Sequence, residues 1–237
     1  MVPGMNKILF PILAAIALGS AIGFLAAPVS TDDKLNRLKK DTEVGKAEAQ
    51  FNLGWRYVDG LGVEKDYAEA LKWYCKAADQ GNAPAQFSRG YMYGNGLGVE
   101  KDYAEALKWY RKAAEQGFAN AQASLGVMYR DGLGVEKDYA EAVKWFRKAA
   151  EQGYAKAQLN LGVMYFDGLG VEEDYAEAYA WFNLAAANGD KDAGKLRNEL
   201  EKLMSPQQVA DAQKRTKELK KLIADKKASG ATPKTSN

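Results

Sequence analysis

The chain has 237 residues, of which 47% are hydrophobic and 27% charged, and its formal net charge is +2. This composition is typical of a globular protein, and the balanced charge argues against a general nucleic-acid binder. The chain has no histidine and one cysteine, Cys75, which excludes zinc sites built on Cys and His, histidine-dependent triads and an internal disulfide. We expect no cofactor and no metal site.

Residues 1–30 are predicted to be an export signal. An uncharged, mostly apolar run from Ile8 to Thr31 lies between Lys7 and Asp32, as in segments that enter a membrane with their amino end inside. The run is long enough to span a bilayer, so it is either a cleaved signal peptide or a retained anchor that associates with the membrane. The sequence has no Asn-x-Ser/Thr glycosylation site, which favours a bacterial envelope. We expect a periplasmic or secreted protein, or one anchored in the inner membrane and facing the periplasm.

The middle of the chain repeats one unit four times, after a predicted cap helix or linker at 31–45. Four tryptophans follow one another at intervals of 36 residues: Trp73, Trp109, Trp145 and Trp181. They define repeats at 46–81, 82–117, 118–153 and 154–189. A fixed period of this length predicts a solenoid, in which each unit completes the core of its neighbour.

Each repeat is predicted to form two helices, A and B. Ala49, Leu53 and Tyr57 give helix A one apolar face, and the glycines that follow allow a tight loop. Helix B is expected to begin at Asp66, with Glu69 completing a capping box. A glycine recurs inside helix A, where it is unfavourable; we therefore expect close contact with an aromatic ring of helix B.

The repeated residues form a pattern: A-x-A-x-x-x-L-G-x-x-Y-x-x-G-x-G-V-x-x-D-x-x-x-A-x-x-W-[YF]-x-x-A-A-x-x-G. Over residues 46–189 this pattern resembles the Sel1-like repeat, a relative of the tetratricopeptide repeat. The resemblance implies an all-α, right-handed α/α superhelix with helical caps, which binds proteins or peptides and shares no common chemistry.

Residues 190–227 are predicted to be helical caps, followed by a disordered tail at 228–237. A helix is expected over Asp190–Met204, with Leu203 on its apolar face. Ser205, Pro206 and Gln208 predict the start of a last helix that runs to about Lys226. Residues 190–237 hold 12 basic and 7 acidic residues, whereas residues 45–189 hold 16 and 20. The last helix is therefore basic, and it is interpreted either as a solvated cap or as a surface for an anionic partner.

Binding residues are sought among positions that differ between repeats. One stripe of helix A contains Glu48, Asn52, Trp55 and Asp59. By resemblance to tetratricopeptide folds, this stripe would line a concave groove. The alternative is that these positions differ between repeats only because they are exposed to solvent and free to change. The candidate ligand-binding residues are Asn52, Trp55, Phe87, Ser88, Arg89, Tyr91, Ser124, Arg130 and Asn160. Arg89 stands where other repeats have leucine, so it either anchors an acidic group of the ligand or forms a structural ion pair.

The sequence favours a non-enzymatic scaffold or regulator in the bacterial envelope that binds a protein or peptide in this groove. An adaptor that binds cell wall or membrane through the basic last helix is the alternative. A carboxylate-based glycan hydrolase is disfavoured, because each repeated aspartate is explained as a helix cap. A monomer is expected, with a disulfide dimer through a surface-exposed Cys75 as the alternative.

Overall fold

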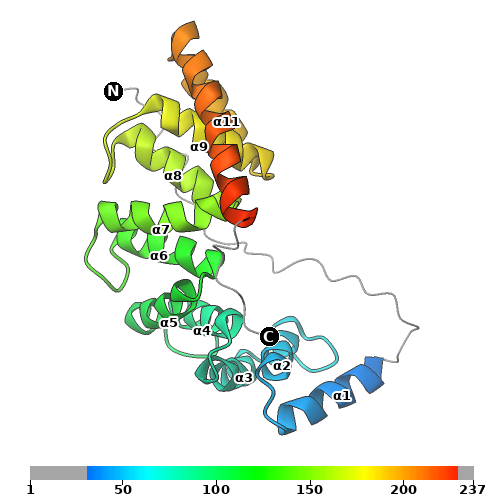
Figure 1. Ribbon diagram of the computed structural model, residues 1–237. Coiled ribbons are helices and arrows are strands. Elements are labelled where there is room, and N and C mark those ends of the chain that lie inside the picture. The colour runs from blue at the N-terminus through cyan, green and yellow to red at the C-terminus, as the bar shows by residue number, and fades with distance from the viewer. Residues whose placement is uncertain (1–30, 229–237) are drawn as a thin grey trace.

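The computed structural model describes residues 31–228, with side chains from residue 36 onward, and that range contains eleven helices and no strand. The helices are α1 (Thr31–Glu43), α2 (Ala47–Asp59), α3 (Tyr67–Asp79), α4 (Ala83–Asn95), α5 (Tyr103–Glu115), α6 (Ala119–Asp131), α7 (Tyr139–Glu151), α8 (Ala155–Asp167), α9 (Tyr175–Ala187), α10 (Lys191–Glu201) and α11 (Pro206–Ala228). From α2 to α9 they form four A/B pairs stacked in chain order (Figure 1). The predicted all-α repeat architecture is confirmed. The predicted export segment at 1–30 and the tail from residue 229 lie outside the described residues.

Each helix B begins at an aspartate N-cap. The Asp66 carboxylate accepts the backbone N–H groups of Ala68 and Glu69 at 2.8 and 3.0 Å. The predicted capping box would also have the Glu69 side chain accept the Asp66 N–H. This part of the prediction is wrong, because the Asp66 N–H donates to the Tyr57 carbonyl of helix A at 3.0 Å. The same backbone bond recurs in the later repeats, from Asp102, Asp138 and Asp174. The cap therefore also joins the two helices of each pair.

The glycine inside helix A contacts an aromatic ring of helix B, as predicted. A Cβ atom at Gly54 would lie 2.8 Å from the Tyr74 ring, and one at Gly126 would lie 2.5 Å from the Phe146 ring. Because real Cβ atoms do not approach so closely, only glycine lets the two helices pack at this distance.

The loop between the two helices also requires glycine. Gly96 ends α4 with φ of 69°, a left-handed conformation that glycine adopts without strain. Gly98 follows with φ of 68°, and a Cβ atom there would lie 2.5 Å from the backbone of Tyr67 in the preceding repeat. The loop of one repeat therefore rests on the start of helix B in the repeat before it.

A ladder of buried glutamines links successive repeats. Gln86 of α4 donates to the Ala78 carbonyl of α3 at 3.2 Å, and its own Oε1 accepts the amide of Gln116 at 2.7 Å. In the same way, the side-chain amide of Gln80 donates to Gln50, that of Gln152 to Gln122, and that of Asn188 to Gln158. Gln86, Gln122 and Gln158 thus each bond a backbone carbonyl and a side-chain amide of neighbouring helices, as buried amides require.

The carboxy-terminal helices close the solenoid in an unexpected way. α10 and α11 do not pair as a fifth hairpin; α11 instead folds back across α9 (Figure 1). Its Leu219 and Ile223 join the core that contains Trp181 and Leu184 of α9. α9 carries a single charged residue, Glu177, because it is covered by both final helices.

Two ion pairs secure α11. Arg215 contacts Glu177 at 2.5 Å, and Lys226 near its end contacts Glu151 of α7 at 2.7 Å. Its start is capped as predicted, since Ser205 and Gln208 exchange hydrogen bonds at 2.8 and 3.3 Å.

The helix predicted over Asp190–Met204 ends earlier than expected. α10 stops at Glu201, and Leu203 is 55% exposed in the turn that follows, so its predicted place on an apolar face is wrong. No helix of the described range has the length and apolar character needed to cross a bilayer.

Candidate functional site: the helix A stripe

Six of the residues predicted to bind a ligand belong to one row of equivalent positions on the four A helices, which we call the helix A stripe; they are Asn52, Trp55, Ser88, Tyr91, Ser124 and Asn160. The other three, Phe87, Arg89 and Arg130, lie at neighbouring positions of the same helices. In α2 the helix A stripe consists of Glu48, Asn52, Trp55 and Asp59, with the equivalent positions of α4, α6 and α8 alongside. Positions four, seven and eleven residues apart share one face of a helix. Because the repeats stack in order, these positions recur on the same side of successive A helices.

The first repeat presents the most open part of the helix A stripe. Glu48, Asn52 and Asp59 are exposed and Trp55 is half-buried. Trp55 makes no hydrogen bond or ring contact with another described residue. The other four tryptophans share one repeated position of helix B, where Trp109, Trp145 and Trp181 are buried in the core and Trp73 is half-buried. Trp55 lies outside this position and belongs to none of the core clusters of the described residues.

Tyr91 and Ser124 continue the stripe in the second and third repeats. Tyr91 is half-buried, with its ring 6.4 Å from that of Phe87. Ser124 is half-buried beside the Tyr110 hydroxyl, and burial raises the pKa of that hydroxyl despite the opposing hydrogen bond to Ser124. Of these two, Tyr91 offers a ring to a ligand, whereas Ser124 supports the adjacent core.

Two of the predicted contact residues are buried in the unbound chain. Phe87 is 3% exposed, and its ring lies 5.5 Å from Tyr110 and 5.4 Å from Phe118. Ser88 is 6% exposed and forms a hydrogen bond with the Tyr74 hydroxyl. Their prediction as groove contacts is corrected: the aromatic and hydroxyl groups of these positions face helix B.

Arg89 forms the structural ion pair that was the alternative to ligand anchoring. Its Nη1 contacts Asp79 at 3.0 Å, and its guanidinium lies 3.8 Å above the centre of the Trp109 ring. The side chain is 15% exposed. Pairing and stacking stabilise a guanidinium where other repeats have leucine, while its buried Nε has no hydrogen-bond partner among the described residues.

Arg130 and Asn160 are also occupied within the protein. Arg130 makes two bonds to Asp131, at 2.7 and 2.9 Å, and a third to Asn160 at 2.5 Å. Their predicted role as free ligand contacts is therefore replaced by a bridge between the third and fourth repeats.

Cys75 is half-buried rather than exposed as predicted. Burial raises the pKa of its thiol, although the nearby Arg89 opposes the shift. A protonated, half-buried thiol is a poor nucleophile.

The stripe is closed at its carboxy-terminal end. Val163 and Phe166 of α8 pack on the cluster formed by Leu200, Met204 and residues of α9. The open part of the stripe is thus its amino-terminal half.

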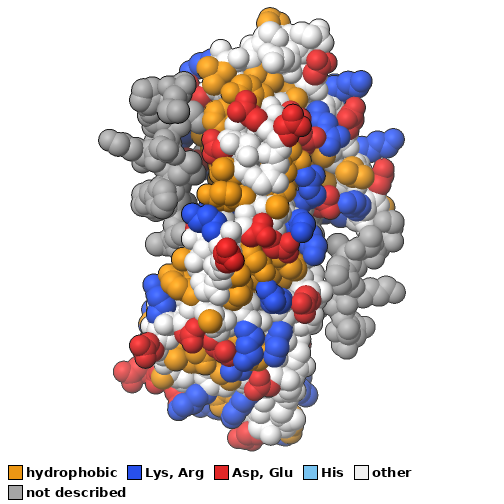
Figure 2. Space-filling model, turned by 90° about the vertical axis from the view of Figure 1, so that its left-hand side faces the viewer, with side chains coloured by type: hydrophobic (Ala, Val, Ile, Leu, Met, Phe, Trp, Pro, Cys, Tyr) orange, Lys and Arg blue, Asp and Glu red, His pale blue; other side chains and the backbone are white. Residues whose placement is uncertain are grey.

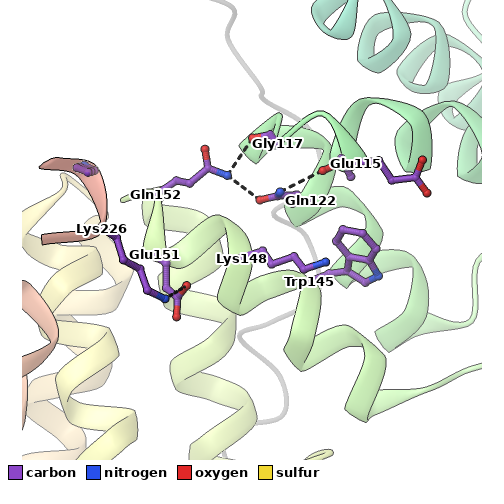
Figure 3. A pocket seen from close by; sticks show the side chains of 10 residues that line it. Glu115, Gly117, Gln122, Trp145, Lys148, Glu151, Gln152 and Lys226 are labelled. Carbon is purple, nitrogen blue, oxygen red and sulfur yellow. Dashed lines mark hydrogen bonds and ion pairs between the residues drawn. The ribbon is translucent and has the colours of Figure 1, made fainter. Parts of the chain in front are cut away.

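Elsewhere, a cavity of about 420 Å³ lies where the end of α11 meets α7 (Figure 3). Lys148 points into it beside Trp145, and Gln122 and Gln152 of the glutamine ladder form its wall.

The glutamine ladder is not among the features predicted from the sequence, although glutamine recurs every 36 residues at 50, 86, 122 and 158. No group of three or more potential metal ligands occurs among the described residues. In the space-filling view, acidic and basic side chains are interspersed with hydrophobic ones on the face shown (Figure 2).

Comparison with known proteins agrees with this architecture. The family model described as Sel1 repeat matches residues 47–82, 83–118, 119–154 and 155–190. A Sel1 repeat protein from Oxalobacter formigenes is 39% identical, with a TM-score of 0.68, over 71% of this chain and 69% of that one. The antigen c5321 of uropathogenic Escherichia coli, described as having an SLR fold, is 33% identical with a TM-score of 0.51, over 87% of this chain and 52% of that one.

A curated relative matches over a shorter stretch. Secretory immunoglobulin A-binding protein EsiB of Escherichia coli O6:H1 (strain CFT073) is 45% identical over 65 residues, which are 27% of this chain and 13% of that protein. The chain thus corresponds to a small part of that relative. Since the family model covers more than half of the sequence and the helix pairs repeat with the same period, the chain belongs to the Sel1 repeat family, whose members generally mediate protein–protein interaction and are typically non-catalytic scaffolds.

Proposed function

We propose that the protein is a non-enzymatic scaffold that binds a segment of another protein on the amino-terminal half of the helix A stripe. The observation that carries this proposal is Trp55, a large aromatic side chain that the repeat core does not use and that remains half-exposed. Tyr91 occupies the same position on the next A helix. Partly exposed aromatic side chains of this kind dominate the binding energy of many protein interfaces.

The polar neighbours of Trp55 and Tyr91 support an extended ligand. Asn52 is exposed one turn before Trp55, and its amide can both donate to and accept from a peptide backbone. Adjacent A helices present these groups in register, which suits a ligand that crosses several repeats.

The test is crosslinking in cells with a photoreactive amino acid at Asn52 or Asn95, both of which are exposed on the stripe. We expect the same protein to be captured from both positions. A photoreactive group at the exposed Glu115, at the end of helix B, is the matched control and should not capture it.

A second measurement ties the capture to Trp55. Replacing Trp55→Ala should weaken binding of the captured protein by at least 10-fold, since truncating an aromatic anchor costs about 2 kcal/mol or more. Unchanged affinity of this variant, with the fold intact by circular dichroism, would overturn the proposed site.

A second candidate function rests on α11. Four of its exposed lysines form no ion pair with another described residue; they are Lys214, Lys217, Lys220 and Lys221. Such a face suits an anionic wall polymer or membrane. Removing α11 is not a clean test, because the helix buries Trp181. Replacing the four lysines with glutamine keeps the core, and loss of binding to anionic vesicles but not of partner crosslinking would assign the function to α11.

Export to the bacterial envelope is part of the proposal and rests on the apolar amino-terminal run. Fractionation of cells, with mass spectrometry of the mature amino terminus, tests both export and cleavage. A cytoplasmic chain with an intact amino terminus would contradict it.

A further inference from the structure

The amino-terminal end of the helix A stripe carries two exposed carboxylates that take part in no ion pair or hydrogen bond within the described residues. They belong to Glu48 and Asp59. Asp59 follows Trp55 by four residues, so the two side chains are neighbours on the helix surface. Glu48 lies on the same face, one turn before Asn52.

The later repeats do not offer this combination. Asn95 replaces Asp59 in the second repeat and donates to the Tyr91 carbonyl at 2.7 Å. Asp131 of the third repeat is neutralised by Arg130 at 2.7 Å. In the fourth repeat the position of Trp55 is Val163, which is packed against the carboxy-terminal cap. Only the first repeat joins a free aromatic ring to unpaired carboxylates.

The cations nearest to this end are engaged elsewhere. Arg56 donates to the Leu61 carbonyl at 3.0 Å. Lys65 lies 4.9 Å from the centre of the Tyr67 ring, and its pKa is raised mainly by the Tyr67 hydroxyl, with a smaller contribution from Asp59. Neither cation forms an ion pair with Glu48 or Asp59, so both carboxylates remain open to a basic ligand beside Trp55.

We propose that this end of the stripe binds a basic side chain of the partner, an arginine or lysine that stacks on Trp55 and is neutralised by Asp59 and Glu48. An aromatic face attracts a cation, and a carboxylate at its edge adds a charge-assisted hydrogen bond. The inference rests on the proposed function and names the chemistry of the segment that the scaffold recognises.

The probes are three synthetic octapeptides in which serine alternates with arginine, glutamine or glutamate. The full chain, in zwitterionic detergent and with ¹⁵N-labelled tryptophan, gives one indole N–H signal for each tryptophan, and Trp55→Phe identifies the signal of Trp55. We expect the arginine peptide to shift this signal at concentrations at least 10-fold below those needed for the glutamine peptide. The glutamate peptide should not shift it.

The matched variants are Asp59→Asn and Asp131→Asn, which change the same position in the first and third repeats. Asp59→Asn should weaken binding of the arginine peptide about 2- to 5-fold, in line with an exposed charged contact. Asp131→Asn should leave it unchanged, and added salt should reduce the difference between the two.

Equal shifts by all three peptides, or equal effects of the two variants, would overturn the inference. The outcome is separable from that of the proposed function. If the protein crosslinked at Asn52 contacts Trp55 through a segment without arginine or lysine, the scaffold function stands and the basic ligand does not.

Discussion

Gly126 lies in the middle of α6, directly against the Phe146 ring of α7, and it provides a test of how closely the two helices pack. Gly126→Ala should lower the free energy of unfolding by about 1–3 kcal/mol, because the new methyl group overlaps the ring. Urea unfolding followed by circular dichroism measures the change.

Gly194 of α10 is the matched control, since a Cβ atom there would meet no atom closer than 3.8 Å. Gly194→Ala should raise the stability by about 0.5–1 kcal/mol, the usual gain of alanine over glycine within a helix. Equal destabilisation by both substitutions would contradict the packing argument.

The buried tyrosine hydroxyls predict a loss of stability at alkaline pH. Burial raises the pKa of Tyr74 and Tyr110 above the usual value of about 10. The unfolded chain therefore releases these protons first, so their contribution is complete below pH 10 and is lost as the pH rises above it. The loss is about 1.4 kcal/mol per pH unit for each group.

Phe146 and Phe182 occupy the same position in the later repeats, so the double variant Tyr74→Phe, Tyr110→Phe is a natural comparison. Urea unfolding at pH 9 and pH 11 should show a smaller loss of stability between the two pH values in this variant than in the original chain. An unchanged loss would assign the alkaline sensitivity to other groups.

At the scale of single residues, the sequence predicts contacts that recur and misses those that depend on orientation. The glycine–ring contact could be predicted because it occurs once in every repeat. Phe87 and Trp55 are both aromatic and close to one face of helix A, yet Phe87 is buried by Phe118, the residue before the next helix A. The repeat pattern alone does not contain this contact across the junction.

At the scale of the elements, we compare two positions at each junction, one on helix B and one on the next helix A. At every junction one of these two residues is an arginine. The pairs are Cys75 with Arg89, Arg111 with Leu125, Arg147 with Leu161, and Asn183 with Arg197. Arg111 and Arg147 bind the hydroxyls of Tyr129 and Tyr165, whereas Arg197 binds Asn183 at 3.0 Å. The two inner junctions thus take their arginine from helix B, and the two outer ones take it from helix A.

This arrangement predicts compensation between Cys75 and Arg89. Cys75→Arg alone brings a second guanidinium into the first junction and should destabilise the protein by about 1–3 kcal/mol. The double variant Cys75→Arg, Arg89→Leu reproduces an inner junction and should return to within about 1 kcal/mol of the original stability.

A double-mutant cycle by urea unfolding measures the coupling between the two positions. Additive effects of the two substitutions would show that the junction has room for two arginines. The sequence contains this covariation, but a partner for Arg89 could only be identified once the pairing of helices was known.

At the scale of the whole molecule, α11 holds the end of the solenoid together. Leu219→Ala and Ile223→Ala should each cost about 2–5 kcal/mol, because both side chains are buried against the core of α9. Leu222→Ala is the control from the same helix. Leu222 is 44% exposed, so its truncation should change the stability by no more than about 0.5 kcal/mol.

Tryptophan fluorescence during urea unfolding reports this change, since Trp181 is covered by α11. Similar effects of Leu219→Ala and Leu222→Ala would mean that α11 is only loosely attached in solution. The path of α11 could not be predicted from the sequence, although the capping residues at its start could. A signal was present in α9, where Ala180 and Leu184 replace lysines of the earlier repeats and create an apolar surface that needs a second cover.

The helix that covers Trp181 and Leu184 is synthesised after all four hairpins. During synthesis the first three hairpins can stack while the fourth still exposes the apolar side of α9 to solvent, a state in which nascent chains are prone to aggregate. Burial of this surface therefore waits for α11, and a ribosome that stalls before α11 releases a product in which α9 is not covered.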